Sequence, residues 1–588
     1  MTRMSATDAA VQVMLDEGVE IVFGIPGAAI LPFYQSIKNA GTIRHYIVRH
    51  EEGGTHAADG YARATGKVGV MLGTSGPAGT NMITGLYTAT ADSIPLICIT
   101  GQAPTHLQHK EAFQAVDIVG CAAPVTKWSV MVKEPAQMPW VFREAFRIAR
   151  DGRPGAVLID LPLDVQRGSI DYEPALSVTL PYTKPAPPLA AVDRTLAMLL
   201  AAERPLLMLG GGVIGAGATE EFRALAEYLQ IPVTITLMGK GGFPEDHPLY
   251  AGIAGIQTQT RYGNQIFLES DLVIAIGARF AERHTGDLAV YRGTRQFIQI
   301  DIDPKQIGRV FNPDLGIVAD AKLALQALLE RARATTAQQP TVWVERVSRL
   351  RESLQRRMDF DTVPVKPPRV FKEINEYFDR DTIFVTAIGL YQIWSGQFQH
   401  SYLPRHYLVC GQAGPLGWEI SACTGAKLGR PDHLVVGIVG DYSFQFLMEE
   451  ISVAVQYRIP FVLVMINNSY MGLIRQAEIA YGMNYAVDLA YTVGNDDSKL
   501  DSIENGIDHV KVMQAMGAPG RRVERPEDIR PALEWATRTS EEQHLPVLVE
   551  VIVEREANAA MGSALDAIKE FEALPEHHIS AKIIATTL

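Results

Sequence analysis

The sequence predicts an α/β protein made of three doubly wound parallel-sheet domains. Short apolar runs rich in β-branched residues alternate with stretches that carry apolar residues at helical spacing, the pattern of parallel sheets with crossover helices. Two proline-rich segments, at 181–193 and 362–369, interrupt this alternation and have the composition of linkers. A chain of 588 residues is long enough for about three to four domains.

The expected boundaries follow these interruptions. We expect an N-terminal domain at 1–180, a central domain at 190–345, a C-terminal domain at 365–553 and a polar, mostly helical tail at 554–588. The N-terminal and C-terminal domains look alike in layout. The apolar runs predict strands at Ile21–Phe23, Val68–Leu72, Pro95–Thr100, Ala156–Ile159, Leu206–Leu209, Leu272–Ile276, Phe297–Ile302, Leu434–Val439 and Phe461–Ile466.

The composition argues against several classes of protein. A hydrophobic fraction of 47% with 20% charged residues is ordinary for a soluble globular chain. The net charge of −13 and the pI near 5.6 argue against nucleic acid or an anionic membrane as a main partner. The four cysteines lack metal-type spacing, and neither a signal peptide nor a membrane-spanning stretch is evident. We therefore expect a soluble protein of the reduced cytoplasm.

The stretch Leu434–Ile474 carries the most specific chemical signal. It reads as a strand, a Gly440-Asp441 turn, a helix over Phe444–Tyr457 that Ser443 could cap, and a second strand ending in Asn467-Asn468. The carboxyl ends of neighbouring parallel strands open on one sheet edge, so Asp441 and Asn468 can meet there. A carboxylate and an amide oxygen are ligands that Mg²⁺ accepts, and the metal would then clamp a diphosphate.

The pair Gly440-Asp441 and Asn467-Asn468 resembles the diphosphate motif of thiamine-diphosphate enzymes. A Gly-Asp turn beside a polar strand end also occurs in doubly wound domains without a metal. The resemblance implies Mg²⁺ ligands at Asp441, Asn468 and the Tyr470 carbonyl. It implies cofactor contacts at Gly440, Tyr442, Ser443, Gly472 and Leu473. Tyr442 departs from the motif, because many members of the family have glycine there.

The turn His50-Glu51-Glu52 follows the apolar run Tyr46–Val48 and opens a helix. Adjacent carboxylates at a helix start are commonly only favourable charges against the helix dipole, and we expect this of Glu52. For Glu51 the resemblance implies a catalytic role. In these enzymes such a glutamate, supplied by the other subunit, relays a proton at the aminopyrimidine so that thiazolium C2 can be deprotonated. A buried carboxyl with a raised pKa suits that task.

Further loops of the two terminal domains fit the same family. Around Ala28 and at Phe113-Gln114 the sequence looks like segments that, in the acetohydroxyacid synthase branch, direct a backbone N–H and a glutamine amide at the substrate carbonyl. Taken alone, such segments are more commonly a turn and a core pair. The segment 412–418 matches the family's apolar loop under the cofactor. The resemblance implies cofactor contacts at Gly389, Leu390, Tyr391, Gly414 and Leu416, and a substrate wall of Phe113, Ile388, Met471 and Ile474.

The central domain carries several loops that follow expected strands. Glycine-rich loops and a carboxylate in such positions can hold the diphosphate and ribose of a dinucleotide. Together they resemble the flavin domain of acetohydroxyacid synthases and glyoxylate carboligases, in which FAD takes no net redox part. A vestigial nucleotide fold that binds nothing is the alternative. The expected FAD contacts are Gly210, Gly211, Gly212, Thr236, Leu237, Gly277, Arg279, Asp301, Ile302 and Asp320.

The resemblance covers nearly the whole chain and is closest to the glyoxylate carboligases of the acetohydroxyacid synthase-like family. Such enzymes condense two glyoxylate molecules to tartronate semialdehyde with release of CO₂. Glu51 departs from this branch, whose well-known members carry an apolar residue there. A branch that kept the glutamate, an engineered replacement and a different 2-oxo acid are all compatible with it. The motifs behind the resemblance include GTSGPAGTNMITGLY, ADSIPLICITGQAP, FAERHTGD, CGQAGPLGW, QFLMEE, MGLIRQ and NAAMGSALD.

Three other functions remain open at this point. The nearest is an acetolactate synthase acting on pyruvate, although the segment Ile474–Ala477 lacks the tryptophan that acetohydroxyacid synthases usually carry there. The others are a pyruvate oxidase-like enzyme that reduces its flavin, and a non-catalytic assembly protein that binds a nucleotide. The resemblance implies thiamine diphosphate, Mg²⁺ and FAD as cofactors, a small 2-oxo acid as substrate, a homodimer as the smallest active unit and a homotetramer as the expected assembly.

Overall fold

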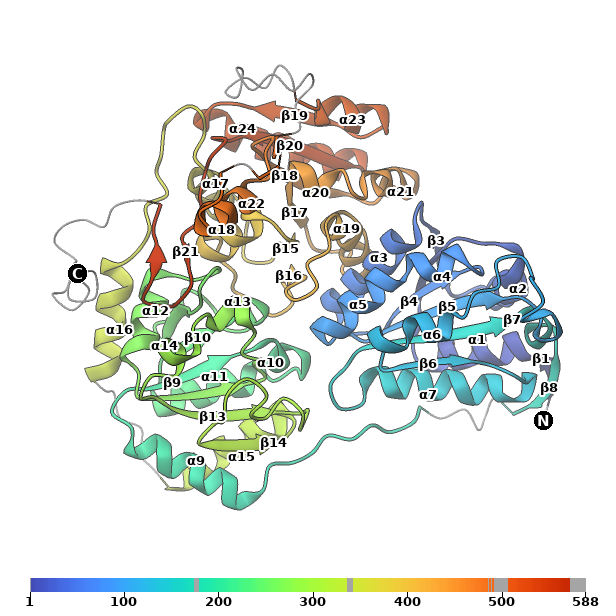
Figure 1. The fold of residues 1–588 in the computed structure, drawn as a ribbon, viewed down its shortest axis with the longest axis horizontal. Coiled ribbons are helices and arrows are strands. Elements are labelled where there is room, and N and C mark those ends of the chain that lie inside the picture. Colours follow the sequence, from blue (N-terminus) through green and yellow to red (C-terminus); the bar gives the residue numbers. More distant parts are fainter. Residues whose placement is uncertain are drawn as a thin grey trace.

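The computed structural model describes residues 2–173, 179–335, 342–484, 486–487, 489–490 and 506–571. Three six-stranded sheets, in each of which every pair of neighbouring strands is parallel, confirm the predicted fold class. Figure 1 shows the N-terminal and C-terminal domains side by side, with the central domain beneath the C-terminal one. Within the described ranges, no helix combines the length and the apolar composition that a membrane crossing requires.

The N-terminal sheet has the order β3 (Arg44–Ile47), β2 (Ile21–Gly24), β4 (Gly69–Gly73), β5 (Leu96–Gln102), β7 (Ala156–Pro162), β6 (Trp128–Met131). A separate two-stranded antiparallel sheet is formed by β1 (Thr2–Ser5) and β8 (Ser169–Tyr172). The helices are α1 (Ala6–Asp16), α2 (Leu31–Ala40), α3 (Glu51–Thr65), α4 (Pro77–Asn81), α5 (Ile83–Asp92), α6 (Ile118–Ala122), α7 (Met138–Arg150) and α8 (Leu163–Gln166), with 3₁₀ turns at Ala28–Ile30, Thr105–Leu107, Ala123–Val125 and Pro135–Gln137.

The central sheet has the order β11 (Tyr250–Ile253), β10 (Val233–Ile235), β9 (Pro205–Leu209), β12 (Leu272–Ile276), β13 (Gln296–Asp301), β14 (Leu315–Val318). Numbered along the chain, this is 3-2-1-4-5-6, the order of dinucleotide-binding sheets. The helices are α9 (Leu189–Ala201), α10 (Gly211–Gly215), α11 (Thr219–Leu229), α12 (Arg261–Glu269), α13 (Glu282–Thr285), α14 (Leu288–Arg292), α15 (Ala321–Thr335) and α16 (Val342–Ser353), with a 3₁₀ turn at Leu237–Gly239.

The C-terminal sheet has the order β16 (Tyr407–Val409), β15 (Ile383–Thr386), β17 (Val435–Gly440), β18 (Phe461–Asn467), β20 (Pro546–Ile552), β19 (Gly520–Val523). Its helices are α17 (Pro367–Tyr377), α18 (Leu390–Phe398), α19 (Trp418–Gly429), α20 (Asp441–Phe444), α21 (Ile451–Tyr457), α22 (Gly472–Ala480), α23 (His509–Ala515) and α24 (Pro526–Gln543), with a 3₁₀ turn, η7, at Met448–Glu450. Numbered along the chain, both terminal sheets have the order 2-1-3-4-6-5, which confirms that the two domains share a layout.

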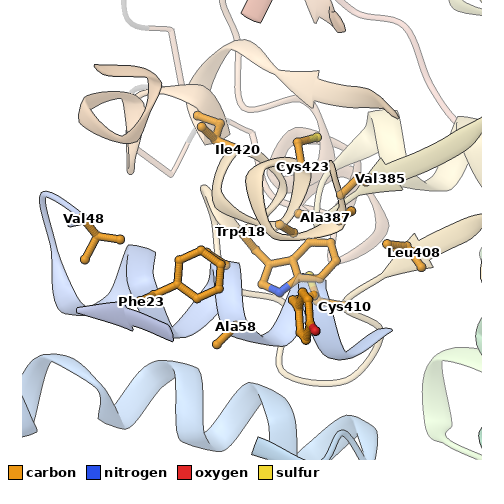
Figure 2. Close-up of a cluster of buried hydrophobic side chains, with 14 of the residues drawn as sticks. Phe23, Val48, Ala58, Val385, Ala387, Leu408, Cys410, Trp418, Ile420 and Cys423 are labelled. Atoms are coloured by element: carbon orange, nitrogen blue, oxygen red, sulfur yellow. The ribbon is translucent and has the colours of Figure 1, made fainter. Parts of the chain in front are cut away.

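Helices α3 and α19 join the terminal domains and lie side by side in Figure 1. Glycines allow their backbones to approach closely: a Cβ at Gly425 would lie 1.8 Å from the Ala57 carbonyl oxygen, and one at Gly60 would lie 2.5 Å from Ala422. The fully buried ring of Trp418 packs at this junction, with Phe23 and Val48 of one domain and Val385 and Leu408 of the other in the same cluster (Figure 2). The terminal domains therefore share one hydrophobic core.

Two local expectations are wrong. The helix expected over Phe444–Tyr457 is broken into α20, η7 and α21, because the chain leaves the helix after Phe444 and carries Glu450 to the N-terminal domain. The described part of the tail, 554–571, has no helix and contains the short antiparallel pair β21 (Met561–Gly562) and β22 (Ile568–Lys569). Its main chain is bound instead by glutamine side chains, such as Gln397 and Gln259 at the Ala560 carbonyl. Residues 572–588 of the expected tail lie outside the described residues.

Candidate active site

The structure brings Asp441 and Asn468 to the same edge of the C-terminal sheet. Strands β17 and β18 pair in register up to Gly440 and Ile466, so the residues that follow them emerge together. Asp441 is 4% exposed, and its Oδ2 accepts the N–H of Ser469 at 2.6 Å, which ties the two loops to each other. The Asn468 amide nitrogen donates to the Arg555 carbonyl at 2.9 Å. The predicted meeting of these residues is thus observed.

The Tyr470 carbonyl, the third expected metal ligand, belongs to a tight turn. It accepts the N–H of Gly472 at 2.8 Å, and Met471 between them has φ −77° and ψ 63°, the geometry of an inverse γ-turn. A carbonyl oxygen has two lone pairs, so this bond leaves it able to bind a cation as well. The turn fixes the direction of the carbonyl at the start of α22.

Two glycines make room for the neighbouring loops. A Cβ at Gly440 would lie 2.6 Å from the Tyr391 ring, and a Cβ at Gly472 would lie 2.6 Å from the end of the Leu390 side chain, so a larger residue at either place would displace its neighbour. Gly389 has φ +147°, a backbone conformation that favours glycine. The expected cofactor contacts at 389–391, 440–443 and 472–473 therefore form one contiguous lining at the strand ends, with Leu473 half-buried beside Gly472.

The loop 411–418 approaches the same edge from β16. Gly414 has φ +64°, and a Cβ there would lie 3.4 Å from Ile388, while Leu416 is half-buried. The Gly417 N–H donates to Ser443 Oγ at 2.9 Å. This bond corrects the expectation that Ser443 caps a helix over Phe444–Tyr457: Ser443 lies within α20, whose N-cap is Gly440, and its hydroxyl holds the loop.

Two buried acids behind this lining were missed in the sequence. Glu419 is fully buried, and burial raises its pKa to about 7; it accepts from the Tyr391 hydroxyl at 3.1 Å. Glu550, also fully buried, accepts from Asn467 Nδ2 at 2.8 Å, pairs with His509 Nδ1 at 2.8 Å and accepts from Arg522 Nε at 2.8 Å. Asn467 in turn accepts from the Ser469 N–H, so this network positions the loop that carries Asn468.

Glu51 stands where the sequence predicts, at the first residue of α3. His50 is the N-cap, and its Nδ1 accepts the N–H of Glu52 at 3.1 Å. Glu51 is 9% exposed, and its Oε2 accepts from Asn81 Nδ2 at 2.8 Å. Glu52 pairs with His56 at 3.4 Å, which lowers the pKa of Glu52 despite its burial and agrees with the structural role expected for it.

Glu450, a third missed acid, holds the turn before Glu51 from the other domain. Its Oε1 accepts the N–H groups of Arg49 at 2.9 Å and His50 at 2.8 Å. Burial raises its pKa to about 7, although these hydrogen bonds lower it. A Cβ at Gly53 would lie 2.6 Å from the Glu450 carboxyl, so Gly53 makes this contact possible. In the sequence, Glu450 is visible only as part of the acidic pair in QFLMEE. The residues around this pair do not indicate that Glu450 binds the turn before Glu51.

The remaining expected residues of the N-terminal domain, Ala28, Phe113 and Gln114, lie in loops that follow strands β2 and β5. Gln114 has φ +56° and accepts from Ser75 Oγ at 3.3 Å, and the exposed Ala28 begins the 3₁₀ turn after β2. A Cβ at Gly73 would lie 3.9 Å from the Glu51 side chain. In the expected substrate wall, Phe113 is 86% exposed and Ile474 is 43% exposed in the single chain, whereas Ile388 and Met471 are half-buried.

A cavity of about 360 Å³ opens at the carboxyl edge of the central sheet and reaches both other domains. It lies where the strand order reverses between β9 and β12, which is where doubly wound sheets bind ligands. A Cβ at Gly210 would lie 2.1 Å from the Gly277 carbonyl, so the two loops at this point touch through glycine. All the other expected flavin contacts line the cavity: Gly211, Gly212, Thr236, Leu237, Gly277, Arg279, Asp301, Ile302 and Asp320.

The residues present fit the groups that the motifs imply. Asp441, Asn468 and the Tyr470 carbonyl supply a carboxylate, an amide oxygen and a main-chain oxygen on two tied loops, which is a donor set for Mg²⁺. In the central cavity, Arg279 offers a positive charge to a diphosphate. Burial raises the pKa of Asp301 to about 6, and a carboxyl in this position would suit a ribose hydroxyl of a dinucleotide.

Comparisons with known proteins agree with this geometry. Family models match as the thiamine pyrophosphate enzyme N-terminal TPP-binding domain at residues 4–121, central domain at 192–328 and C-terminal TPP-binding domain at 387–551. Glyoxylate carboligase from Escherichia coli O157:H7 is 49% identical over 99% of this chain and 98% of its own length. A probable acetolactate synthase large subunit from Methanocaldococcus jannaschii is 39% identical over 94% and 92%, and the large subunit from Corynebacterium glutamicum is 37% identical over 94% and 88%. The chain therefore belongs to the thiamine pyrophosphate enzyme family.

Proposed function

We propose that this protein is a thiamine-diphosphate- and Mg²⁺-dependent carboligase that condenses two glyoxylate molecules to tartronate semialdehyde and CO₂. The observation that carries the proposal is the metal edge, by which we mean the carboxyl ends of β17 and β18, where Asp441 is hydrogen-bonded to the loop that carries Asn468. Glu51, the expected proton relay, is the first residue of α3. The similarity to an enzyme named glyoxylate carboligase over nearly the full length of both chains supports this choice of substrate.

Each set of residues has a task in this proposal. Asp441, Asn468 and the Tyr470 carbonyl hold the cation, and the lining at 389–391 and 440–443 holds the diphosphate. When bound, the cofactor supplies a nucleophilic carbon and an electron sink for the charge left by loss of CO₂. Glu51 carries a proton to and from the aminopyrimidine, and its contact with the Asn81 amide holds the carboxylate in place. The Ala28 N–H and the Gln114 amide stabilise the oxyanion that forms at the substrate carbonyl.

We further propose that the smallest active unit is a homodimer and that the protein assembles as a homotetramer. Glu51, Ala28 and Gln114 follow strands of the N-terminal sheet, and the proposed metal ligands follow strands of the C-terminal sheet. In this arrangement the N-terminal set of one subunit completes the C-terminal set of its partner. The exposure of Phe113, at 86% in the single chain, fits a residue that a second subunit covers.

The preference for glyoxylate over pyruvate is supported at the start of α22. Acetohydroxyacid synthases usually place a tryptophan in this segment, whereas here Gln476 donates to the Ala559 carbonyl at 2.7 Å and accepts the Ala559 N–H at 3.1 Å. This reciprocal pair fastens α22 to the segment after β20. We propose that the apolar residues Ile388, Met471 and Ile474 favour an acid with hydrogen, rather than methyl, on its carbonyl carbon.

We also propose that the central cavity binds FAD and that the flavin stays oxidised during turnover. The strand order, the glycine contact between Gly210 and Gly277, and the lining by Arg279 and Asp301 support a dinucleotide. Decarboxylation followed by condensation needs no electron acceptor. Flavin absorbance followed anaerobically with substrate tests this: bleaching in each cycle would identify an oxidase instead.

A substrate panel is the direct test of the proposed reaction. The purified protein, supplied with Mg²⁺ and thiamine diphosphate, is offered glyoxylate, pyruvate and 2-oxobutyrate separately and in pairs. Products are then identified by mass. Tartronate semialdehyde should dominate wherever glyoxylate is present. Acetolactate as the main product would move the protein to the acetolactate synthases, and no product from any acid would refute carboligase activity.

A further inference from the structure

The carboxylate of Asp92 lies where all three domains meet. Asp92 ends α5 of the N-terminal domain and is 7% exposed. Its Oδ2 accepts from the Gly411 N–H at 2.9 Å and from Arg63 at 3.1 Å. Its Oδ1 accepts from the Gln412 N–H at 3.1 Å and from Arg279 of the central domain at 3.4 Å. One side chain thus holds two main-chain N–H groups and two guanidinium groups.

The same residues form part of the wall of the central cavity. Asp92, Arg279, Gly411 and Gln412 all line it. Arg279 also donates to the Ala91 carbonyl, next to Asp92, so its side chain reaches from the cavity to the end of α5. A group bound in the cavity would therefore lie against residues that Asp92 holds.

Gly411 and Gln412 also begin the loop that supports the proposed thiamine site. The loop continues through Gly414, beside Ile388, to Gly417, whose N–H donates to Ser443 of the diphosphate lining. Its start is fastened further by Arg63, which donates to the Val409 carbonyl at 2.7 Å, and by Arg283, which donates to the Gly411 carbonyl at 3.3 Å. The loop 411–418 is thus the physical connection between the cavity and the metal edge.

We infer that Asp92 is a positioning residue that couples occupancy of the central cavity to the placement of the loop 411–418. An anionic ligand that binds Arg279 in the cavity fixes this guanidinium and, through it, the Asp92 carboxylate. The N–H groups of Gly411 and Gln412 are then held before thiamine diphosphate arrives, so its binding orders less of the loop. This inference rests on the proposed function of the cavity. Under it, a flavin that takes no part in redox chemistry would serve to position the loop 411–418.

Linked affinities test the coupling. Both cofactors are removed from the full-length protein, and the Kd for thiamine diphosphate with Mg²⁺ is measured by calorimetry, with and without saturating FAD. FAD should tighten thiamine diphosphate binding by about 5- to 150-fold, and by reciprocity thiamine diphosphate should tighten FAD binding by the same factor. In Asp92→Asn the factor should fall to within about twofold of unity, because Asn lacks the charge that holds Arg279 and Arg63.

The matched control is Asp160→Asn. Asp160 is also a buried aspartate of the N-terminal domain, but it is bonded to Thr100 and Gln102, away from the loop. This variant should keep the wild-type coupling factor. Equal coupling in wild type and in folded Asp92→Asn would overturn the inference, as would loss of coupling in both variants.

Hydrogen exchange keeps the inference testable if Asp92→Asn does not fold. In the wild-type protein, FAD should slow exchange of the amides at Gly411 and Gln412. Tight FAD binding that leaves this exchange unchanged refutes the coupling but not the proposed cofactor. A wild-type protein that binds no FAD refutes the cofactor, and the coupling with it.

Discussion

Replacing Glu450 by glutamine should make the stability of this protein less dependent on pH. Glu450 is 3% exposed and accepts two main-chain N–H groups through Oε1. The amide oxygen of glutamine can accept the same two bonds, so the substitution removes the charge and keeps the shape. The variant therefore isolates what ionisation of this buried carboxyl costs the fold.

The magnitude follows from the pKa of Glu450, which is raised from 4.5 to about 7 by burial. An acid whose pKa is higher in the folded state binds its proton more tightly there. Ionisation of Glu450 therefore does not affect the free energy of unfolding below about pH 4.5. It lowers this free energy progressively between about pH 4.5 and pH 7, and by a constant amount above pH 7. The difference between the two pKa values, at about 1.4 kcal/mol per pH unit, corresponds to a loss of about 3 kcal/mol in the free energy of unfolding. The variant should gain this much relative to wild type between pH 4.5 and pH 8.

Thermal unfolding measures the difference. At an unfolding entropy of about 2.1 cal/mol/K per residue, 3 kcal/mol corresponds to about 8 °C if a unit of ~180 residues unfolds, or about 2 °C if the whole chain does. The Tm of Glu450→Gln minus that of wild type should rise by this amount from pH 5 to pH 8. Glu20→Gln is the control, because its side chain is 59% exposed. A Tm difference that stays constant over this range would refute the reasoning.

Three further predictions concern the reaction. Asp441→Ala should abolish turnover and cofactor binding, because the diphosphate is held through the cation; calorimetry that shows tight binding of thiamine diphosphate with Mg²⁺ would contradict the metal assignment. Glu51→Val should slow proton exchange at the cofactor's C2 by about 10²–10⁴-fold, followed by NMR after quenching, and unchanged exchange would remove Glu51 from this role. Glyoxylate should outcompete pyruvate by about 10–200-fold, the effect of about 1–3 kcal/mol for one methyl group in an apolar pocket, measured by product masses from a mixture. Equal use of both acids would show that the pocket does not discriminate.

The sequence was informative wherever a local pattern determines the structure. The strand Leu272–Ile276 has the predicted bounds, and the Asp441 and Asn468 loops meet because parallel strands end on a shared edge. The same rule located the cavity loops at Gly210 and Gly277.

What the sequence did not reveal depends on contacts between distant segments. Glu450 and His50 are 400 positions apart, and Asp92 and Gln412 are 320 apart. No periodicity or motif encodes such pairs, so the sequence alone indicated no partner for either carboxylate. The broken helix before Tyr457 has the same origin, since η7 places Glu450 against another domain. Sequence patterns predict elements and strand-end loops, whereas the supporting acids become visible only once the domains are packed.

The identical strand order of the two terminal sheets suggests how the protein originated. Helix α3 follows the second strand of one sheet and α19 the second strand of the other, and each carries a glutamate in its first turn, Glu51 and Glu419. Such correspondence is expected of a gene duplication whose copies diverged. Under the proposed function, one copy carries the metal ligands Asp441 and Asn468, and the other carries the buried acid Glu51. Under that proposal, neither copy alone would hold the complete set of catalytic residues.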